Sequence, residues 1–332
     1  MTSPSHPPTR DPGPAAHRGL GVRAAARFPF PLPNGWFQVA YADELATDAL
    51  LPLHYFGRDL VAFRDEAGEA RVLDAHCPHL GANLAYGGTV SEGRVRCPFH
   101  HWEFGGDGRC TGVPYAKRTP ANARIRSWPV ALRSGLVLVY FDKERREPPY
   151  EIPAIPEYAS DAWTDYYRQE WTVRSCNQEL AENTVDPAHF KYVHGTAELP
   201  DANAWVEKHV LRAKLGYPIA TSDGIVHGEI DIYAYGPGIG VSYFHGVIET
   251  TVVVSGTPID EETVHQRLSF MVKHRETPEA TAGLAAVFVG EISRQFEEDI
   301  AMWENKAYWQ RPVLCNGDGP IATVRSWAQQ FY

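Results

Sequence analysis

Two pairs of cysteine and histidine residues could hold a metal centre. Cys77 and His79 form a Cys-x-His unit, and Cys97 and His100 form a Cys-x-x-His unit twenty residues further on. A proline follows each cysteine and restricts the backbone beside it, so each unit is expected on a tight loop. Thiolate and imidazole are both strong ligands for zinc and iron. The two loops therefore predict a metal site.

Two kinds of metal centre compete for these loops. A Cys₂His₂ zinc site usually takes both cysteines from one unit and both histidines from another. A Rieske [2Fe–2S] cluster needs two cysteines on one iron and two histidines on the other, and one of each per loop would provide them. The spacing therefore favours the cluster over zinc. It also selects His100 and leaves the role of the adjacent His101 open, while Cys110 is expected to be a packing residue.

A second group of possible ligands lies in the segment ENTVDPAHFKYVH. Asp186 and His189 are three residues apart and would share one face of a helix. His194 follows five residues later and comes within reach if the helix distorts after Pro187. Two imidazoles and one carboxylate around open positions are typical of non-haem Fe(II) oxygenases. The alternative is a helix that happens to carry two histidines.

A third iron ligand is expected in the helix that contains QFEEDIAMWENK. Its apolar positions form one stripe: Phe288, Ile292, Phe296 and Trp303. Asp299 falls on this stripe, whereas Glu298 aligns with polar residues on the solvent side and Glu297 lies between. A carboxylate on a buried face is costly unless it is paired or bound to metal. The pattern favours Asp299 as the ligand, and a buried aspartate that caps another polar group is the alternative.

The composition excludes several classes of protein. The chain has 332 residues and a formal net charge of -10, which argues against a general nucleic-acid binder. Five cysteines do not suggest a disulfide framework, and no apolar run is long enough for a transmembrane helix. Residues 1–28 are rich in Pro, Arg and Ala and are predicted to be a disordered tail of a cytoplasmic protein.

The pattern of apolar runs divides the chain into two domains. Residues 29–148 contain short apolar runs bounded by Gly and Pro, such as WFQVAY and GLVLVYF, which predict a β-rich domain. Residues 149–332 follow a Pro-rich boundary and predict an α+β domain. Its expected elements are a helix over 175–195 that bends or restarts at Pro187, strands within 205–275 and one long helix over 278–309.

The only Gly-x-Gly-x-Gly string, GPGIG at 236–240, lacks the dinucleotide-binding spacing and is predicted to be a turn between strands. The sequence therefore predicts no nicotinamide site, and electrons would have to come from a separate reductase.

These motifs resemble those of Rieske oxygenase α-subunits, and the resemblance covers nearly all of the chain after residue 30. The loops carry CPHLG and CPFHHW, and ENTVDPAHFKYVH matches the D-x₂-H-x₄-H motif of that family. The stretches CPFHHWEFGGDGRCTGVPYA, QFEEDIAMWENKAYW and RPVLCNGDGPI resemble the branch that contains 3-ketosteroid 9α-hydroxylase oxygenases and cholesterol 7-desaturases.

The resemblance implies a fold and two cofactors. A β-rich Rieske domain would bind a [2Fe–2S] cluster through the four loop residues. A catalytic domain of antiparallel sheet and helices, with a helix-grip, START-like fold, would bind mononuclear Fe(II) through His189, His194 and Asp299. Asp186 would not be a ligand: it would hydrogen-bond His189, reach His100 of a neighbouring subunit in a homotrimer and carry the electron path. Glu182 or Asn183, one turn earlier, could also line this site.

The resemblance also implies an activity. The chain would be the terminal oxygenase of a Rieske monooxygenase that hydroxylates or desaturates an apolar, polycyclic, steroid-like substrate with O₂. Electrons would come from an NAD(P)H-dependent reductase, directly or through a ferredoxin. The alternatives are an oxygenase for another apolar or aromatic natural-product scaffold, a pure electron-transfer Rieske protein, and a zinc-stabilised binding protein. The substrate, the carbon attacked and the reductase are not fixed by the sequence.

Overall fold

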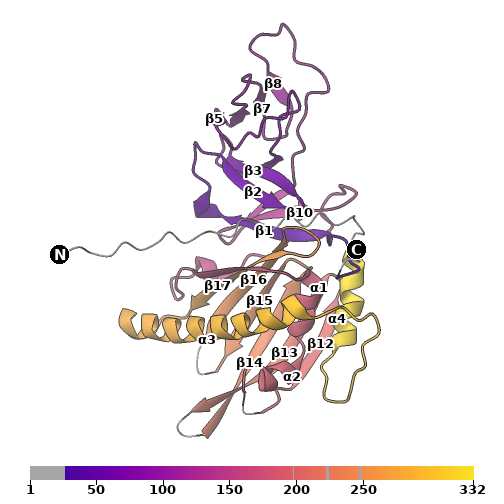
Figure 1. The fold of residues 1–332 in the computed structure, drawn as a ribbon. Coiled ribbons are helices and arrows are strands. Elements are labelled where there is room, and N and C mark those ends of the chain that lie inside the picture. The colour runs from indigo at the N-terminus through magenta and orange to yellow at the C-terminus, as the bar shows by residue number, and fades with distance from the viewer. Residues whose placement is uncertain (1–26, 197, 222–223, 247–248) are drawn as a thin grey trace, which may run out of the picture.

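The computed structural model describes residues 27–332 apart from 197, 222–223 and 247–248. Two parts stack end to end, a narrow β-rich part and a broad sheet crossed by a long helix (Figure 1). Residues 1–26 of the predicted tail lie outside the described residues, whereas Phe28 is buried. No described helix combines the length and the apolar character that a membrane span requires.

The N-terminal part consists of three small antiparallel sheets with the strand orders β1-β10-β9, β2-β3-β4 and β5-β6-β7-β8. Their strands are β1 (Gly35–Tyr41), β2 (Leu51–Tyr55), β3 (Arg58–Arg64), β4 (Ala70–Asp74), β5 (Thr89–Ser91), β6 (Arg94–Arg96), β7 (Glu103–Phe104), β8 (Cys110–Gly112), β9 (Val130–Arg133) and β10 (Leu136–Phe141). A 3-10 turn, η1 (Ala42–Glu44), follows β1. The predicted β-rich domain is confirmed, and WFQVAY and GLVLVYF pair with each other as β1 and β10.

The C-terminal part is one seven-stranded antiparallel sheet in the order β11-β17-β16-β15-β14-β13-β12. Its strands are β11 (Tyr167–Val173), β12 (Ala202–Glu207), β13 (Val210–Thr221), β14 (Gly224–Tyr235), β15 (Ile239–His245), β16 (Thr250–Pro258) and β17 (Val264–Val272). GPGIG links β14 to β15, with Gly236 at a φ of 88°, so the predicted turn is confirmed.

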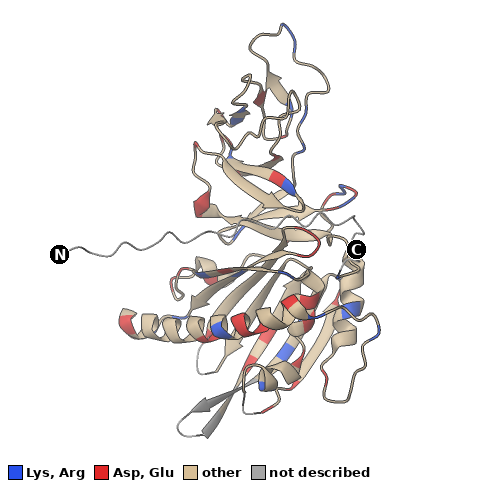
Figure 2. Ribbon diagram, viewed as in Figure 1, with Lys and Arg blue, Asp and Glu red and all other residues tan. Residues whose placement is uncertain are grey.

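Helices cover one face of this sheet and complete the predicted α+β fold. They are α1 (Asn177–Asn183), α2 (Pro187–Tyr192), α3 (Pro278–Asn305) and α4 (Ile321–Ala328), with 3-10 turns η2 (Pro156–Ala159) and η3 (Gln329–Phe331). The helix predicted over 175–195 is thus two helices, and the second begins at Pro187 as expected. The long helix starts at Pro278 but ends at Asn305 instead of residue 309, because Lys306 is extended. Acidic and basic residues alternate with others along α3 (Figure 2).

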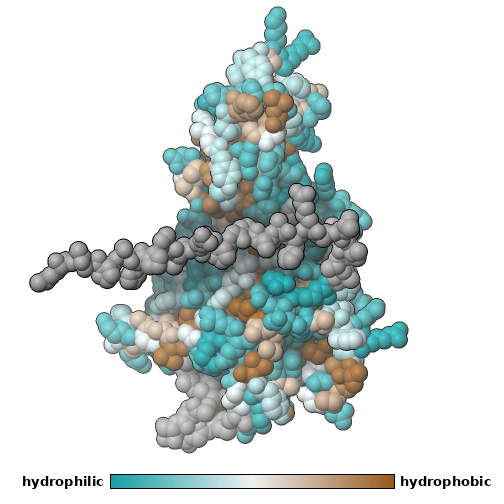
Figure 3. Space-filling view, viewed as in Figure 1, coloured by the Kyte–Doolittle hydropathy of each residue, from teal (hydrophilic) through white to brown (hydrophobic). Residues whose placement is uncertain are grey.

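Apolar side chains are exposed at the tip of the N-terminal part, the end remote from the large sheet (Figures 1 and 3). Leu80 is 65% exposed and Phe99 60% exposed, and Tyr115 is exposed to a similar extent. Leu80 and Phe99 directly neighbour the histidines of the two predicted cluster loops. The two loops therefore lie at the surface, and the exposed side chains of Leu80, Phe99 and Tyr115 form an apolar rim around them.

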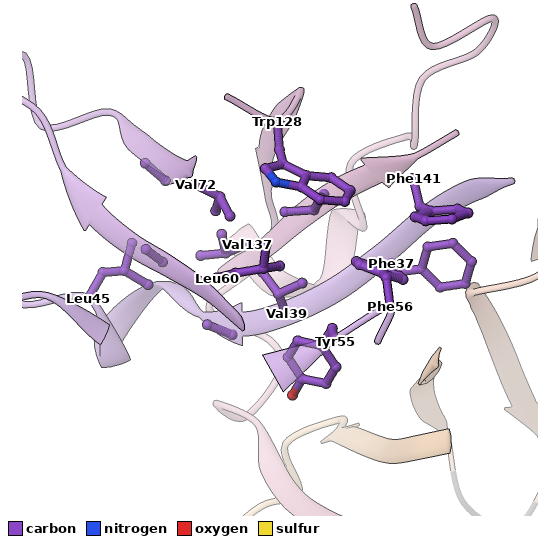
Figure 4. Packing of buried hydrophobic residues seen from close by; sticks show 14 residues of the cluster. Phe37, Val39, Leu45, Tyr55, Phe56, Leu60, Val72, Trp128, Val137 and Phe141 are labelled. Atoms are coloured by element: carbon purple, nitrogen blue, oxygen red, sulfur yellow. The ribbon is translucent and has the colours of Figure 1, made fainter. Parts of the chain in front are cut away.

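A buried apolar cluster forms the core of the N-terminal part, between β1, β10 and the β2-β3-β4 sheet (Figure 4). Its members include Phe37, Val39, Leu60, Trp128 and Val137. Because side chains alternate along a strand, Phe37 faces this cluster while Gln38 faces the second part of the chain. There the Gln38 side chain accepts a hydrogen bond from Ser255 Oγ at 2.6 Å. The two parts therefore share a continuous packed interface through β1 and β16.

Candidate metal centres and cavity

The two cysteine–histidine loops have matching backbones. In the first loop the Gly81 N–H donates to the Cys77 carbonyl at 2.9 Å, and in the second the His101 N–H donates to the Cys97 carbonyl at 3.1 Å. Gly81 has a φ of 77° and His101 a φ of 59°. His101 therefore occupies the left-handed turn position that glycine fills in the first loop. This gives His101 a backbone role, and His100 remains the predicted ligand of this loop.

The four side chains of the loops converge in a way that suits a cluster. Cys77 and Cys97 are buried, and the rings of His79 and His100 lie 4.6 Å apart between centroids. The buried Nδ1 of His79 has no hydrogen-bond partner among the described residues. Burial raises the pKa of the Cys77 thiol to about 11. A metal would satisfy the orphaned nitrogen and stabilise the thiolate, so these residues fit a [2Fe–2S] cluster.

The geometry distinguishes a cluster from zinc. All ligands of one tetrahedral zinc lie within ~4 Å of each other, since each sits about 2.0–2.3 Å from the ion. Across the part of the chain that the structure describes, no three of the loop ligands lie within 4.8 Å of one another, whereas one other trio does. The two cysteines and the two histidines instead form two separate pairs of ligands, which matches a centre with two irons.

That trio is His189, His194 and Asp299. Asp186 caps α2, since its Oδ1 accepts from the Ala188 N–H at 3.0 Å, and Pro187 occupies the first helical position. The His194 N–H then points to the His189 carbonyl, five residues earlier, at 3.4 Å. This widened turn is the predicted distortion, and it brings the two rings to 5.0 Å between centroids.

Asp299 reaches both histidines from α3. Its Oδ1 lies 3.4 Å from His194 Nε2, and its Oδ2 lies 4.0 Å from His189 Nε2. Asp299 is 6% exposed, as expected for the apolar stripe of α3. The three ligand atoms are close enough to bind one ion and leave its remaining positions open, which suits Fe(II).

Comparisons with known proteins agree with both centres. Residues 35–129 match the model of the Rieske [2Fe-2S] domain, and residues 139–332 match that of the 3-ketosteroid 9alpha-hydroxylase C-terminal domain. The chain belongs to the 3-ketosteroid 9α-hydroxylase family of Rieske oxygenases. It is therefore an oxidoreductase whose cofactors are a [2Fe–2S] cluster and a mononuclear iron, and as an oxygenase component it depends on a separate reductase.

Relatives with known functions cover most of this Rieske oxygenase. It is 34% identical to the oxygenase component of 3-ketosteroid-9-alpha-monooxygenase from Mycobacterium tuberculosis, over 95% of this chain and 86% of the relative. It is 30% identical to cholesterol 7-desaturase nvd 1 from Ciona intestinalis, over 90% of this chain and 68% of the relative.

Solved structures share the fold. Dicamba monooxygenase bound to dicamba has a TM-score of 0.69 at 21% identity and covers 90% of this chain and 96% of its own. NdmA of Pseudomonas putida CBB5 with caffeine has a TM-score of 0.75 at 19% identity and covers 89% of each chain.

Two further groups orient the trio in this Rieske oxygenase. Asn183 Nδ2 donates to Asp299 Oδ2 at 2.9 Å and lies 3.2 Å from His189 Nε2. His194 Nδ1 lies 3.0 Å from Glu298 Oε2. The prediction that Glu298 faces solvent is therefore wrong in part: the carboxylate is 35% exposed, yet it reaches across to a histidine that the widened turn brings toward α3.

The structure refines two sequence expectations about neighbouring residues. His189 Nδ1 contacts Asp186 through the backbone carbonyl, at 2.5 Å, and the Asp186 carboxylate is engaged in capping α2 instead. Of the two residues expected to line the site one turn earlier, Asn183 does so. Glu182 points away and pairs with Arg325 at 2.8 Å.

The two histidines have opposite pKa shifts. Burial lowers the pKa of His189, against the attraction of Asp299. Burial also acts to lower the pKa of His194, but its hydrogen bonds to Asp299 and Glu298 outweigh that effect and raise the pKa. A raised pKa favours the protonated imidazole of His194, so metal binding and proton binding compete at this residue.

A cavity of about 250 Å³ opens onto the trio. Its floor is the sheet, its roof is formed by α1 and α3, and most of its walls are apolar, including Leu180, Phe190, Ile230 and Phe296. No Lys or Arg occurs among the described residues that line it. The cavity therefore suits an uncharged apolar molecule beside the metal.

Proposed function

We propose that this chain is the terminal oxygenase of a monooxygenase that hydroxylates or desaturates a steroid-like substrate. The observation that carries the proposal is an apolar cavity without Lys or Arg among its described lining residues, which contains His189, His194 and Asp299 on its wall. A carboxylated aromatic substrate would require a cationic partner that this lining lacks. The relatives that act on ketosteroids and cholesterol support the same substrate class.

We propose the following residue roles. Cys77 and Cys97 would bind one iron of the cluster, and His79 and His100 the other. His189, His194 and Asp299 would bind the mononuclear iron. When bound, the two centres supply electron relay and activation of O₂. The chain itself orients the ligands through the hydrogen bonds of Asn183 and Glu298 to the trio, and it excludes water with the apolar cavity wall.

The overall reaction consumes O₂, two electrons and two protons. In hydroxylation one oxygen atom enters a C–H bond of the substrate and the other leaves as water. In desaturation two hydrogen atoms are removed from adjacent carbons and both oxygen atoms leave as water. The electrons would come from an NAD(P)H-dependent reductase, directly or through a ferredoxin, which also favours a cytoplasmic location.

We further propose a homotrimer in which the cluster of one subunit serves the iron of the next. The cluster loops lie at the end of the N-terminal part remote from the large sheet (Figure 1), so transfer within one chain would cross that whole part. Asp186 lies on a separate surface groove with Trp309, Pro312 and Leu314. The apolar side chains of this groove could pack against the exposed Leu80 and Phe99 beside the cluster of a neighbouring subunit. Asp186 would then be the catalytic link between His189 and the incoming His100.

The domain boundaries stay a proposal as well: residues 29–148 for the Rieske domain and 149–332 for the catalytic domain, after the tail of residues 1–28.

Turnover with defined substrates tests the function. The purified oxygenase would be supplied with a surrogate ferredoxin and reductase, and O₂ uptake and product mass would be measured with a 3-ketosteroid, a 3-hydroxysterol and a carboxylated aromatic compound. We expect a steroid to give coupled O₂ uptake, with the gain of one oxygen atom or the loss of two hydrogen atoms distinguishing the two reactions. Turnover of the aromatic acid alone would overturn the proposal.

A further inference from the structure

One amide side chain in the cavity has no hydrogen-bond partner among the residues that the structure describes. Gln266 of β17 is 3% exposed and lines the cavity on the same strand face as Leu268. Its side chain makes no hydrogen bond to any residue within the described ranges, although the neighbouring Arg267, on the opposite face, binds Gln38 and Tyr55. Amide groups inside folded proteins are nearly always hydrogen-bonded, to protein, to water or to a ligand. The amide of Gln266 is therefore positioned to bind something inside the cavity.

A second amide faces the same space. Asn177 is 5% exposed, and its Nδ2 donates to the Gly256 carbonyl at 2.7 Å and to the Pro237 carbonyl at 3.0 Å. These two hydrogen bonds fix the plane of the amide and identify the other atom as the oxygen, Oδ1. No described residue donates a hydrogen bond to this Oδ1. Gly256 pairs with Gln266 across β16 and β17. A Cβ at Gly256 would lie 2.9 Å from Gln266 Oε1 and 3.3 Å from Asn177 Nδ2, so the glycine keeps the space between the amides open.

The length of helix α1 gives the distance between the metal ligands and the end of the cavity that holds Asn177 and Gln266. Asn177, Leu180, Ala181 and Thr184 follow the i, i+3, i+4, i+7 pattern and all line the cavity, so α1 runs along it. Asn177 begins the helix, and Asn183, which donates to Asp299, ends it. Six residues at about 1.5 Å each separate the two ends by ~9 Å. A ligand that spans both ends must be longer than a single six-membered ring.

The other polar wall residues are less suited to be the anchor. Asn183 is engaged with the metal ligands, and Gln295 donates to Glu291 at 2.8 Å. Thr184 and Ser242 are only partly buried, so water can satisfy their hydroxyls.

We propose that Gln266 is a specificity-determining residue that donates its amide N–H to an uncharged carbonyl or hydroxyl oxygen of the substrate. Asn177 Oδ1 accepts from that oxygen when it is a hydroxyl, and the apolar body of the substrate lies along α1 toward the iron ligands. This inference rests on the proposed function and adds to it the place where the oxygen of the substrate is held. It places the attacked carbon at least one ring away from the anchored oxygen.

The test compares three steroids that differ only in their oxygens: one with a ring-A oxygen, one with a D-ring oxygen and one with neither. Dissociation constants and kcat/KM would be measured for the wild type, Gln266→Met and Gln266→Glu, with Ser242→Ala as the control on the same wall. Gln266→Met keeps the length of the side chain. We expect it to weaken binding of one oxygen-bearing steroid about tenfold, the loss typical of one neutral hydrogen bond, and to leave the oxygen-free steroid unchanged.

Gln266→Glu provides an independent measurement. A carboxylate cannot donate to a ketone but can accept from a hydroxyl, so we expect it to reject the keto form of the affected steroid and retain the hydroxy form. Equal effects of Gln266→Met on all three steroids, or a Ser242→Ala effect of the same selectivity, would overturn the inference while leaving the steroid function in place. If the wild type binds none of the steroids, the proposed function fails and this inference fails with it.

Discussion

Replacing Glu298 by alanine removes the carboxylate that holds His194 in position. His194 Nδ1 lies 3.0 Å from Glu298 Oε2, and the other oxygen of this carboxylate contacts Arg294. Loss of a group that orients a metal ligand typically weakens metal binding 10–100-fold, which corresponds to about 1.4–2.7 kcal/mol. Since the carboxylate is 35% exposed and shared with Arg294, the lower end applies, and we expect about a tenfold loss.

The assay is competition for the mononuclear iron by a chelator of known affinity, with the visible absorption of the cluster as an internal reference. Glu297→Ala is the matched control, because Glu297 is the adjacent carboxylate on α3 and contacts Trp171 at 3.4 Å instead of a histidine. Glu298→Gln keeps an acceptor oxygen and should lose only a few-fold. Equal iron affinity in Glu298→Ala and the wild type, or an equal loss in Glu297→Ala, would refute the reasoning.

Three further predictions follow from contacts outside the iron site. His101→Gly removes a side chain from a left-handed position, so we expect an unchanged cluster spectrum and a free energy of unfolding raised by about 1 kcal/mol, whereas His100→Gly should lose the cluster spectrum. Arg325→Met removes the cationic partner of the buried Glu182 carboxylate, which among the described residues keeps only the hydrogen bond from Gln178. It should lower the free energy of unfolding by about 3 kcal/mol in urea titration; a loss below ~1 kcal/mol would contradict this. Burial lowers the pKa of His265, so the unfolded chain binds its proton first as pH falls below about 6.5. The free energy of unfolding should therefore decrease with falling pH in that window, and His265→Gln should reduce the slope; an unchanged slope would exclude His265 as its source.

The candidate metal ligands could be selected from the sequence because their chemistry is visible in residue type and spacing. Thiolate and imidazole in two equivalent loops have few other uses, and Asp299 stands out because a carboxylate on an apolar helical stripe needs a strong partner. The same periodicity placed Phe288 and Trp303 on the buried face of α3.

What the sequence could not provide depends on where neighbouring elements approach. The phase of α3 alone predicts that Glu298 faces solvent. Its contact with His194 arises because the widened turn after α2 brings that histidine toward it. The backbone role of His101 follows from a positive φ that residue type does not reveal. Gln266 lies among strands with no motif, so only the fold shows that its amide faces the cavity.

The most direct test of the account is the iron content of anaerobically purified wild type and Asp299→Ala, read together with the visible spectrum of the cluster. The account predicts about three irons per wild-type chain, two of them in the cluster. It predicts about two irons in Asp299→Ala, with the cluster spectrum unchanged. Retention of the third iron in Asp299→Ala, or a colourless wild type that holds zinc, would contradict it.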